Sequence, residues 1–281
     1  MWFARVKTDR TVPMPMSQNV PEAIMSSLQI KYPPLGLQPI IFGNQYNLKD
    51  PEQLDSFLEV VAGAGYTAIE ANPHDAALFT ELSLKYGITH AGLHVGISSG
   101  TETDAHIETL KTTGAKDVCN SGLLRWSDLT LQDYVDAIPV LNTMGAAFRD
   151  AGIAFHYHNH AFEFEKVDGD LRGIDILLDG LDPTAVDLCV DVAWVYRGGI
   201  DPASFLKQHD SRIGYVHLKD TTTGDAFSEI GKGVLDFDSI MAALASLSRV
   251  RWAMVEQDNT KLDPEESITI SREYLAERYG Y

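Results

Sequence analysis

The sequence predicts an α/β fold in which eight parallel strands close into a (β/α)8 barrel, the TIM barrel. From about residue 38 onward, eight short apolar segments alternate with eight segments of helical periodicity. This alternation predicts a parallel sheet. Eight such units in about 240 residues predict that the sheet is closed. A doubly wound open sheet is the competing fold, and it is disfavoured because no glycine-rich phosphate loop follows the first strand.

Capping and turn signals place the individual elements. Asp50 and Pro51 open the first helix, Gln53 stands at the capping-box position, and Gly65 ends the helix. Similar signals predict strands at 39–43, 66–71, 89–95, 115–119, 153–160, 186–194, 213–219 and 251–257. They predict helices at 51–64, 75–86, 101–113, 131–150, 173–180, 237–248 and 264–278, with one more beginning at Pro202.

The chain divides into an extension and one domain. Residues 1–36 carry little periodicity and are interrupted by five prolines, so they predict an N-terminal extension. Residues 37–281 form the predicted barrel. A chain of 281 residues with 44% hydrophobic residues is long enough to bury a large core.

The amino-acid composition limits the classes of binding partner that we expect. A net charge of −18 predicts a surface that repels phosphate backbones and anionic lipids, so neither nucleic acid nor a membrane is an expected partner. Cys119 and Cys189 lie among apolar residues and are predicted to be buried thiols in a reducing compartment. We identify no signal peptide or transmembrane segment, and therefore expect a cytoplasmic protein.

The fifth predicted strand has an unusual polar face. His156, His158 and His160 alternate along it, so their side chains point the same way. Each buried imidazole needs a hydrogen-bond partner, which makes three of them a poor core filling. The pattern favours a metal site or an acid/base site over three satisfied core histidines.

Further ionisable residues stand at the ends of predicted strands, where the active sites of such barrels lie. They are Glu70, His94, Asp191, His217, Lys219 and Glu256. His158, Asp191, His217 and Glu256 come from four successive strands, and two imidazoles with two carboxylates are suitable ligands for a divalent metal ion. Internal salt bridges, such as Asp191 with Lys219, are the structural alternative.

Four motifs resemble the xylose isomerase-like TIM barrel superfamily, whose members are often labelled sugar phosphate isomerase/epimerase. They are Leu-Cys-Val-Asp191-Val-Ala-Trp194, Val-His217-Leu-Lys219-Asp220, Ile-Gly231-Lys-Gly233-Val-Leu-Asp236-Phe and Val-Glu256-Gln-Asp258. The resemblance covers about residues 38–278 and implies one divalent ion held by the same four residues. It implies Mn²⁺ first, with Mg²⁺, Co²⁺ or Zn²⁺ as alternatives. A homo-oligomer is common among such proteins and stays open here.

The resemblance implies an enzyme acting on a small-molecule sugar, a keto sugar or keto-glycoside, through a metal-stabilised enediolate. Many relatives have Glu where His158 stands, and in ketose 3-epimerases that Glu is half of an acid/base pair. His158 therefore weakens a two-carboxylate epimerase mechanism. A lyase or dehydratase, eliminating from a 3-keto-glycoside or an inosose, is the main alternative.

We predict catalytic roles for three residues. Glu256 is the first candidate base and His160 the second, while Lys219 donates a proton or holds the enediolate oxygen. Substrate contacts are predicted for Glu70 and His94, which could instead hydrogen-bond other site residues. They are also predicted for Trp194 and Lys232, for which simple packing and a solvated loop lysine are the alternatives.

Two other functions compete with this prediction. A non-catalytic sugar-binding barrel is disfavoured because all four metal positions hold competent ligands. An apurinic-site endonuclease shares the barrel, but the charge of −18 and a single inferred metal site oppose it.

Overall fold

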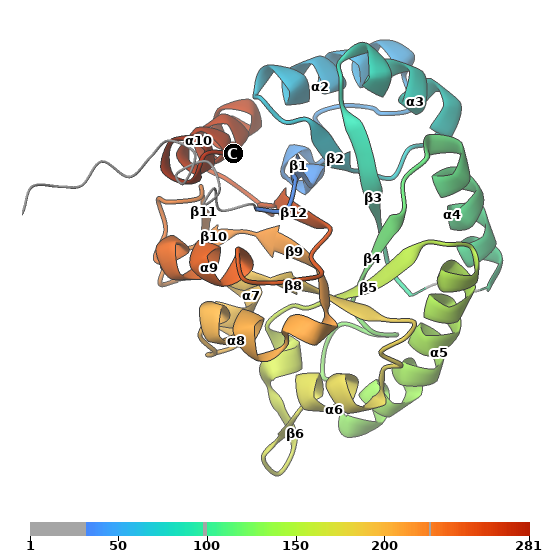
Figure 1. The fold of residues 1–281 in the computed structure, drawn as a ribbon, viewed down its shortest axis with the longest axis vertical. Helices are drawn as coiled ribbons and strands as arrows, with labels where there is room; N and C mark the ends of the chain where they lie inside the picture. The colour runs from blue at the N-terminus through green and yellow to red at the C-terminus, as the bar shows by residue number, and fades with distance from the viewer. Residues whose placement is uncertain (1–31, 98–99, 225) are drawn as a thin grey trace, which may run out of the picture. The chain divides into compact units, whose positions relative to one another are not determined.

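The structure is a computed structural model that describes residues 32–97, 100–224 and 226–281. Eight parallel strands form a closed barrel in the order β1-β12-β9-β8-β5-β4-β3-β2, with helices around it (Figure 1). The predicted TIM barrel is therefore confirmed. The barrel strands are β1 (Leu35–Leu37), β2 (Ala68–Glu70), β3 (Thr89–Val95), β4 (Asp117–Ser121), β5 (Ala154–His158), β8 (Asp187–Asp191), β9 (Ile213–Leu218) and β12 (Trp252–Val255).

Helices connect the barrel strands along the chain. They are α2 (Pro51–Gly63), α3 (Ala76–Lys85), α4 (Gly100–Thr113), α5 (Leu131–Asp150), α6 (Gly173–Gly180), α7 (Val192–Arg197), α8 (Pro202–Gln208), α9 (Phe237–Leu244) and α10 (Pro264–Tyr279). Two small antiparallel pairs, β6 (Lys166–Asp168) with β7 (Leu171–Arg172) and β10 (Asp220–Thr221) with β11 (Phe227–Ser228), lie outside the barrel sheet. Among the helices formed by the described residues, none has the length and apolar character needed to cross a membrane.

The first strand lies earlier than predicted. Residues 39–42 form a short 3-10 helix, η1 (Pro39–Phe42), because the Gln38 side chain accepts a hydrogen bond from the Ile40 N–H at 2.7 Å and Pro39 has no N–H for a ladder. The strand is instead Leu35–Leu37, where Leu35 pairs with Ala253. The 1–36 boundary of the extension remains a prediction.

The fifth and sixth predicted strands are shorter than expected. β5 ends at His158, so His160 lies beyond the strand. β8 ends at Asp191, whose Oδ1 accepts hydrogen bonds from the N–H groups of Ala193 and Trp194 at 2.9 and 3.0 Å. This cap starts α7, so Trp194 is helical rather than part of a strand.

An apolar layer and a polar group of contacts lie inside the barrel. One apolar layer takes a residue from each of six strands, namely Ala68, Ala91, Cys119, Cys189, Tyr215 and Met254. At the amino-terminal end, the Asp117 Oδ1 lies 3.0 Å from the His156 Nε2 and accepts a hydrogen bond from the Arg251 Nε at 2.6 Å. His156 is therefore held in a structural pair at the opposite end of the barrel from the carboxyl ends of the strands.

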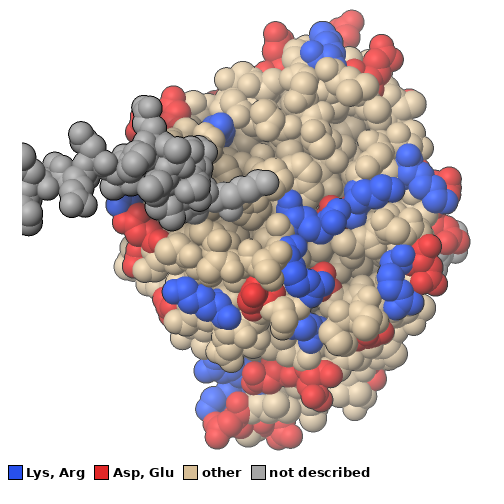
Figure 2. Space-filling model, viewed as in Figure 1, with Lys and Arg blue, Asp and Glu red and all other residues tan. Residues whose placement is uncertain are grey.

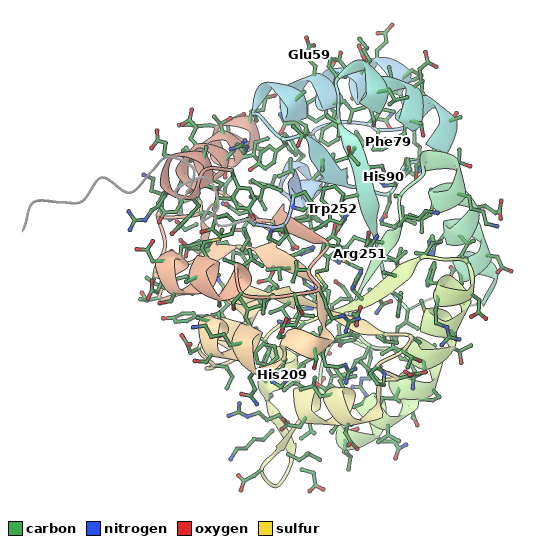
Figure 3. All side chains as sticks on the ribbon, viewed as in Figure 1. Glu59, Phe79, His90, His209, Arg251 and Trp252 are labelled. Atoms are coloured by element: carbon green, nitrogen blue, oxygen red, sulfur yellow. The ribbon has the colours of Figure 1, made fainter. Side chains whose placement is uncertain are left out.

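Figures 2 and 3 show this amino-terminal end, where Arg251 precedes β12 and Trp252 begins it. Basic side chains lie across the middle of this face, and acidic groups lie mainly nearer its edges (Figure 2). His90 packs beside Phe79, with ring centroids 5.0 Å apart (Figure 3). His90 is a buried histidine whose ring contacts the Thr113 hydroxyl at 2.7 Å and the Ala71 carbonyl at 2.9 Å.

Candidate metal centre and adjoining cavity

Four buried side chains converge at the carboxyl ends of neighbouring strands. His158 ends β5, Asp191 ends β8, His217 lies in β9, and Glu256 directly follows β12. These strands adjoin in the barrel, as the sequence predicted. One ligand atom from each of the four side chains lies within 4.8 Å of the others. All four side chains are buried, and Glu256 is the most exposed at 4%.

The facing atoms of this cluster have no hydrogen-bond partners among the residues that the structure describes. The His158 Nε2 lies 3.7 Å from the Asp191 Oδ2 and 3.6 Å from the Glu256 Oε2, and the His217 Nδ1 contacts the same Glu256 oxygen. Among the described residues, none hydrogen-bonds any of these four atoms with acceptable geometry. Buried polar atoms without partners are costly. Two imidazole nitrogens and two carboxylate oxygens therefore fit a divalent cation at the position that they face.

A chain of contacts orients both histidines from behind. The His217 Nε2 lies 3.2 Å from the Glu70 Oε2, and the other Glu70 oxygen lies 2.6 Å from the His94 Nδ1. The His94 Nε2 contacts the Ser121 hydroxyl, which lies 3.2 Å from the His158 Nδ1. An Nε2–H donated by His217 to Glu70 leaves the Nδ1 lone pair facing the cluster, as a metal ligand requires.

Lys219 supplies the positive charge beside the carboxylates. Its ammonium lies 3.4 Å from the Asp191 Oδ2 and 3.1 Å from the Glu256 Oε1, and it contacts Asp258. The ion pair that the sequence suggested as a structural alternative is therefore present. However, it does not provide partners for the facing nitrogens of His158 and His217.

Burial and charge shift the pKa values of the site. Burial lowers the pKa of His158, but its contacts with Asp191 and Glu256 raise it more, to about 10. Burial raises the pKa of Glu256, while Lys219 and His217 lower it well below its usual range. Burial, with the nearby charge of His158, lowers the pKa of His160 to about 3. Without a cation, Asp191 and Glu256 stabilise the protonated form of His158. A bound divalent cation would replace that proton.

A cavity of about 310 Å³ opens beside the cluster. Four predicted site residues line it, namely His94, His158, His160 and Glu256. Glu70 and Lys219 do not line it, because both are buried behind the cluster. Lys232 is exposed on its loop and does not line it either, so its substrate contact remains a prediction without a position at the cavity.

The cavity includes residues to which the sequence analysis assigned no role. Ser121, Trp126 and Asp258 line it. Ser121 ends β4, and Asp258 belongs to the Val-Glu256-Gln-Asp258 motif, so their places at strand ends could have indicated them. Trp126 lies in a loop, and its sequence position gives no such signal.

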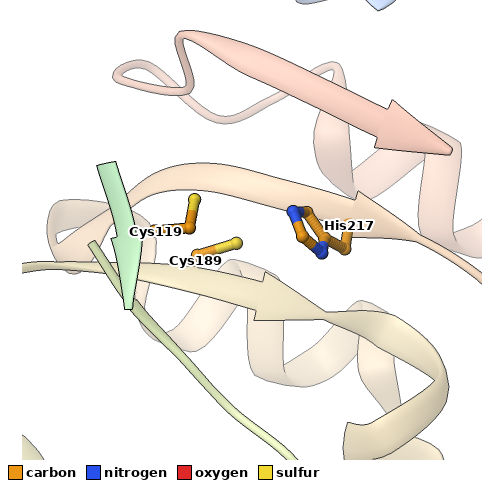
Figure 4. Close-up of side chains that lie close together, drawn as sticks. All are labelled: Cys119, Cys189 and His217. Atoms are coloured by element: carbon orange, nitrogen blue, oxygen red, sulfur yellow. The ribbon is translucent and has the colours of Figure 1, made fainter. Parts of the chain in front are cut away.

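The two thiols lie next to the centre. Cys119 and Cys189 are both free and buried, as predicted. Figure 4 shows their sulfur atoms near the His217 ring, and ligand atoms of all three residues lie within 4.8 Å of one another. β5 separates the strands that carry them, so the two Cα atoms are about two strand spacings apart, roughly 9 to 10 Å. A disulfide needs a shorter Cα separation, so this pair is not arranged for one.

The chain belongs to the xylose isomerase-like TIM barrel family, whose model matches residues 58–278. It is similar to an inosose dehydratase of Geobacillus kaustophilus (strain HTA426), at 26% identity over 86% of this chain and 93% of that protein. A sugar phosphate isomerase/epimerase of Parabacteroides distasonis ATCC 8503 has a similar structure, with a TM-score of 0.70 at 19% identity over 89% of this chain and all of that one.

A structure of the IOLI protein with a bound zinc atom is also similar in fold. Its TM-score is 0.69 at 19% identity, over 88% of this chain and 98% of that one. The family resemblance stated from the four motifs is confirmed by these matches.

Proposed function

We propose that the protein is a divalent-metal-dependent enzyme that acts on a keto sugar or keto-glycoside by removing a proton next to the carbonyl. It is a carbohydrate-modifying enzyme of the isomerase/epimerase or lyase type. The observation that carries this proposal is the set of four buried ligand atoms that have no hydrogen-bond partner among the described residues and face one position beside a cavity large enough for a sugar ring.

His158, Asp191, His217 and Glu256 would hold the ion. A bound divalent cation supplies Lewis acidity towards a carbonyl oxygen. We expect Mn²⁺, with Mg²⁺, Co²⁺ or Zn²⁺ as alternatives.

The proposed acid/base groups differ in their positions. His160 lines the cavity outside the four-atom cluster, so its ring can contact a substrate there. Glu256 also lines the cavity, but one of its oxygens faces the cluster and Lys219 holds the other. We therefore favour His160 over Glu256 as the base. Lys219 keeps the carboxylates of the site charged and in place.

A lyase is the second candidate, and two observations support it. His158 replaces the Glu that a two-carboxylate epimerase uses, and an inosose dehydratase is similar over most of this chain. In such an elimination a base takes the proton from the C–H bond next to the carbonyl, and the electron pair of that bond is delocalised towards the carbonyl oxygen. This pair then forms a C=C bond to the β-carbon as the C–O bond to the β-substituent breaks, and the leaving oxygen takes up a proton.

The proposal is tested with a panel of ketoses, inososes and 3-keto-glycosides in deuterated water, with and without Mn²⁺ or Mg²⁺. Reactions are stopped with a chelator and followed by NMR. We expect metal-dependent exchange of the proton next to the carbonyl, together with an epimer, an isomer or an unsaturated product that identifies the reaction. His160→Gln should abolish exchange, whereas His90→Gln, which changes a buried histidine outside the site, should retain it.

A complete lack of exchange across the panel would contradict the enzyme proposal and would favour a non-catalytic sugar-binding barrel. Exchange that persists in His160→Gln but disappears in Glu256→Gln with the ion still bound would transfer the role of base to Glu256.

A further inference from the structure

A second and larger cavity, of about 800 Å³, lies beside the first one. Its walls come from α7 and the segment after it, represented by Trp194, Tyr196 and Ile200, and from Thr222 and Thr223 after β10. Both segments follow the carboxyl ends of barrel strands, the end at which such barrels bind their substrates.

A pair of neighbouring rings brings the two cavities close together. His160 lines the first cavity and Trp194 lines the second, and their ring centroids are 5.3 Å apart. Ala161, the residue after His160, lines the second cavity. The indole Nε1–H of Trp194 is buried and has no hydrogen-bond partner among the described residues. The two cavities are therefore close enough for two linked rings of one ligand to occupy one cavity each.

The second cavity is suited to a neutral ring with hydroxyl groups. Trp194, Tyr196 and Ile200 offer aromatic and apolar surface, and Tyr196 is 39% exposed. Thr223 adds a hydroxyl-bearing side chain, whereas the Thr222 hydroxyl already donates to the Ala226 carbonyl at 3.0 Å. The charged groups at this site are already engaged. Arg197 donates to the Thr221 hydroxyl at 2.8 and 2.9 Å, and Asp201 caps α8.

We propose that this second cavity binds the leaving-group ring of a keto-glycoside whose keto-sugar ring occupies the first cavity. The inference rests on the proposed function and narrows its substrate class. The first cavity is at the small end of the range of small-molecule sites, about 300 to 1,000 Å³, and so suits a single sugar ring. A free ketose or an inosose would leave the larger cavity unused.

Binding of unreactive ligands tests the inference without relying on turnover. Phenyl β-glucoside, cellobiose and methyl β-glucoside have no keto group, and their affinities for the metal-loaded wild-type protein are measured by calorimetry. The two-ring ligands should bind about tenfold more tightly than methyl β-glucoside, because one additional ring is stacked. The phenyl and disaccharide ligands distinguish an aromatic leaving group from a second sugar.

Thr223→Trp fills the second cavity from an exposed position, so the fold should be retained. It should weaken binding of the two-ring ligands about tenfold and change methyl β-glucoside binding by less than about twofold. Tyr196→Ala should act in the same direction. Leu84→Trp, at a 74% exposed position on α3, is the matched control and should change neither affinity.

Equal wild-type affinities for one-ring and two-ring ligands would overturn the inference. A loss of equal size for both ligand types in Thr223→Trp, or no loss for either, would overturn it as well. These results are independent of the exchange assay. If no keto sugar exchanges its proton, the proposed function fails, even where the binding data support a two-ring site.

Discussion

Glu70 is the residue whose replacement most directly tests how the metal centre is oriented. Its two oxygens serve two histidines, with the Oε2 at 3.2 Å from the His217 Nε2 and the Oε1 at 2.6 Å from the His94 Nδ1. Glu70→Gln leaves only one side-chain oxygen to accept hydrogen bonds from the two histidines. Where the Gln amide N–H group faces His217, the His217 Nε2 must accept a hydrogen bond from it. The ring proton of His217 then moves to the Nδ1, which faces the cluster.

The expected loss of metal affinity in Glu70→Gln follows from the contact of Glu70 with His217. Removing a group that hydrogen-bonds the outer nitrogen of a ligating histidine lowers metal affinity about 10- to 100-fold. This factor corresponds to roughly 1.4 to 2.7 kcal/mol of binding free energy. Glu70 is buried and its charge faces two imidazoles, so we expect a value near the upper end.

Metal affinity is measured by competition with a fluorescent chelator, on protein stripped with EDTA and then titrated with Mn²⁺ or Zn²⁺. Asp117→Asn is the matched control. It removes another buried carboxylate from a histidine, His156, which lies outside the cluster. Asp117→Asn should lower stability but leave metal affinity within about twofold of wild type, because its histidine offers no ligand atom to the ion.

Two results would refute this account of Glu70. One is a Glu70→Gln protein that binds the ion as tightly as wild type. The other is an equal loss of affinity in Asp117→Asn, which would mean that general destabilisation of the barrel lowers affinity. Circular dichroism at the titration temperature establishes that both variants are folded.

Two further predictions concern metal content and pH. Elemental analysis should find about one divalent ion per chain, and either His217→Ala or Asp191→Ala should lose it; full metal content in both variants would contradict the four-ligand centre. Burial raises the pKa of Glu163 from 4.5 to about 7, partly offset by the hydrogen bond from Tyr157. Its folded form therefore keeps a proton that the unfolded chain loses, so its contribution to stability falls by about 3 kcal/mol as pH rises from 4.5 through 7. Free energies of unfolding in urea should show that the stability of Glu163→Gln relative to wild type increases by about this amount between pH 5 and pH 8. The same difference between the two proteins at both pH values would contradict the prediction.

Much of the fold could be predicted because its signals are local. Asp50 and Pro51 start α2 where predicted, since a cap and a helical stripe depend only on neighbouring residues. The first strand was missed because Leu35–Leu37 has three residues and little periodicity, whereas Pro39–Phe42 looks like a strand until the Gln38 cap is seen. Helix α7 was missed because the Asp191 cap lies inside an apolar run that resembles a continuing strand.

The convergence of His158, Asp191, His217 and Glu256 could also be predicted, because a polar residue at the end of an apolar strand is unusual and parallel strands bring such ends together. The pairing of Glu70 with His217 could not, because 147 residues separate them and only the barrel register brings their side chains to 3.2 Å. The separation of His156 from the cluster, despite its place in the alternation, likewise depends on Asp117 at the opposite end of the barrel. The sequence by itself thus determined the barrel and the residue types that converge at the candidate metal centre. Tertiary structure decided which groups orient those residues and that a second cavity, lined by Trp194, lies near His160, because both depend on contacts between distant segments.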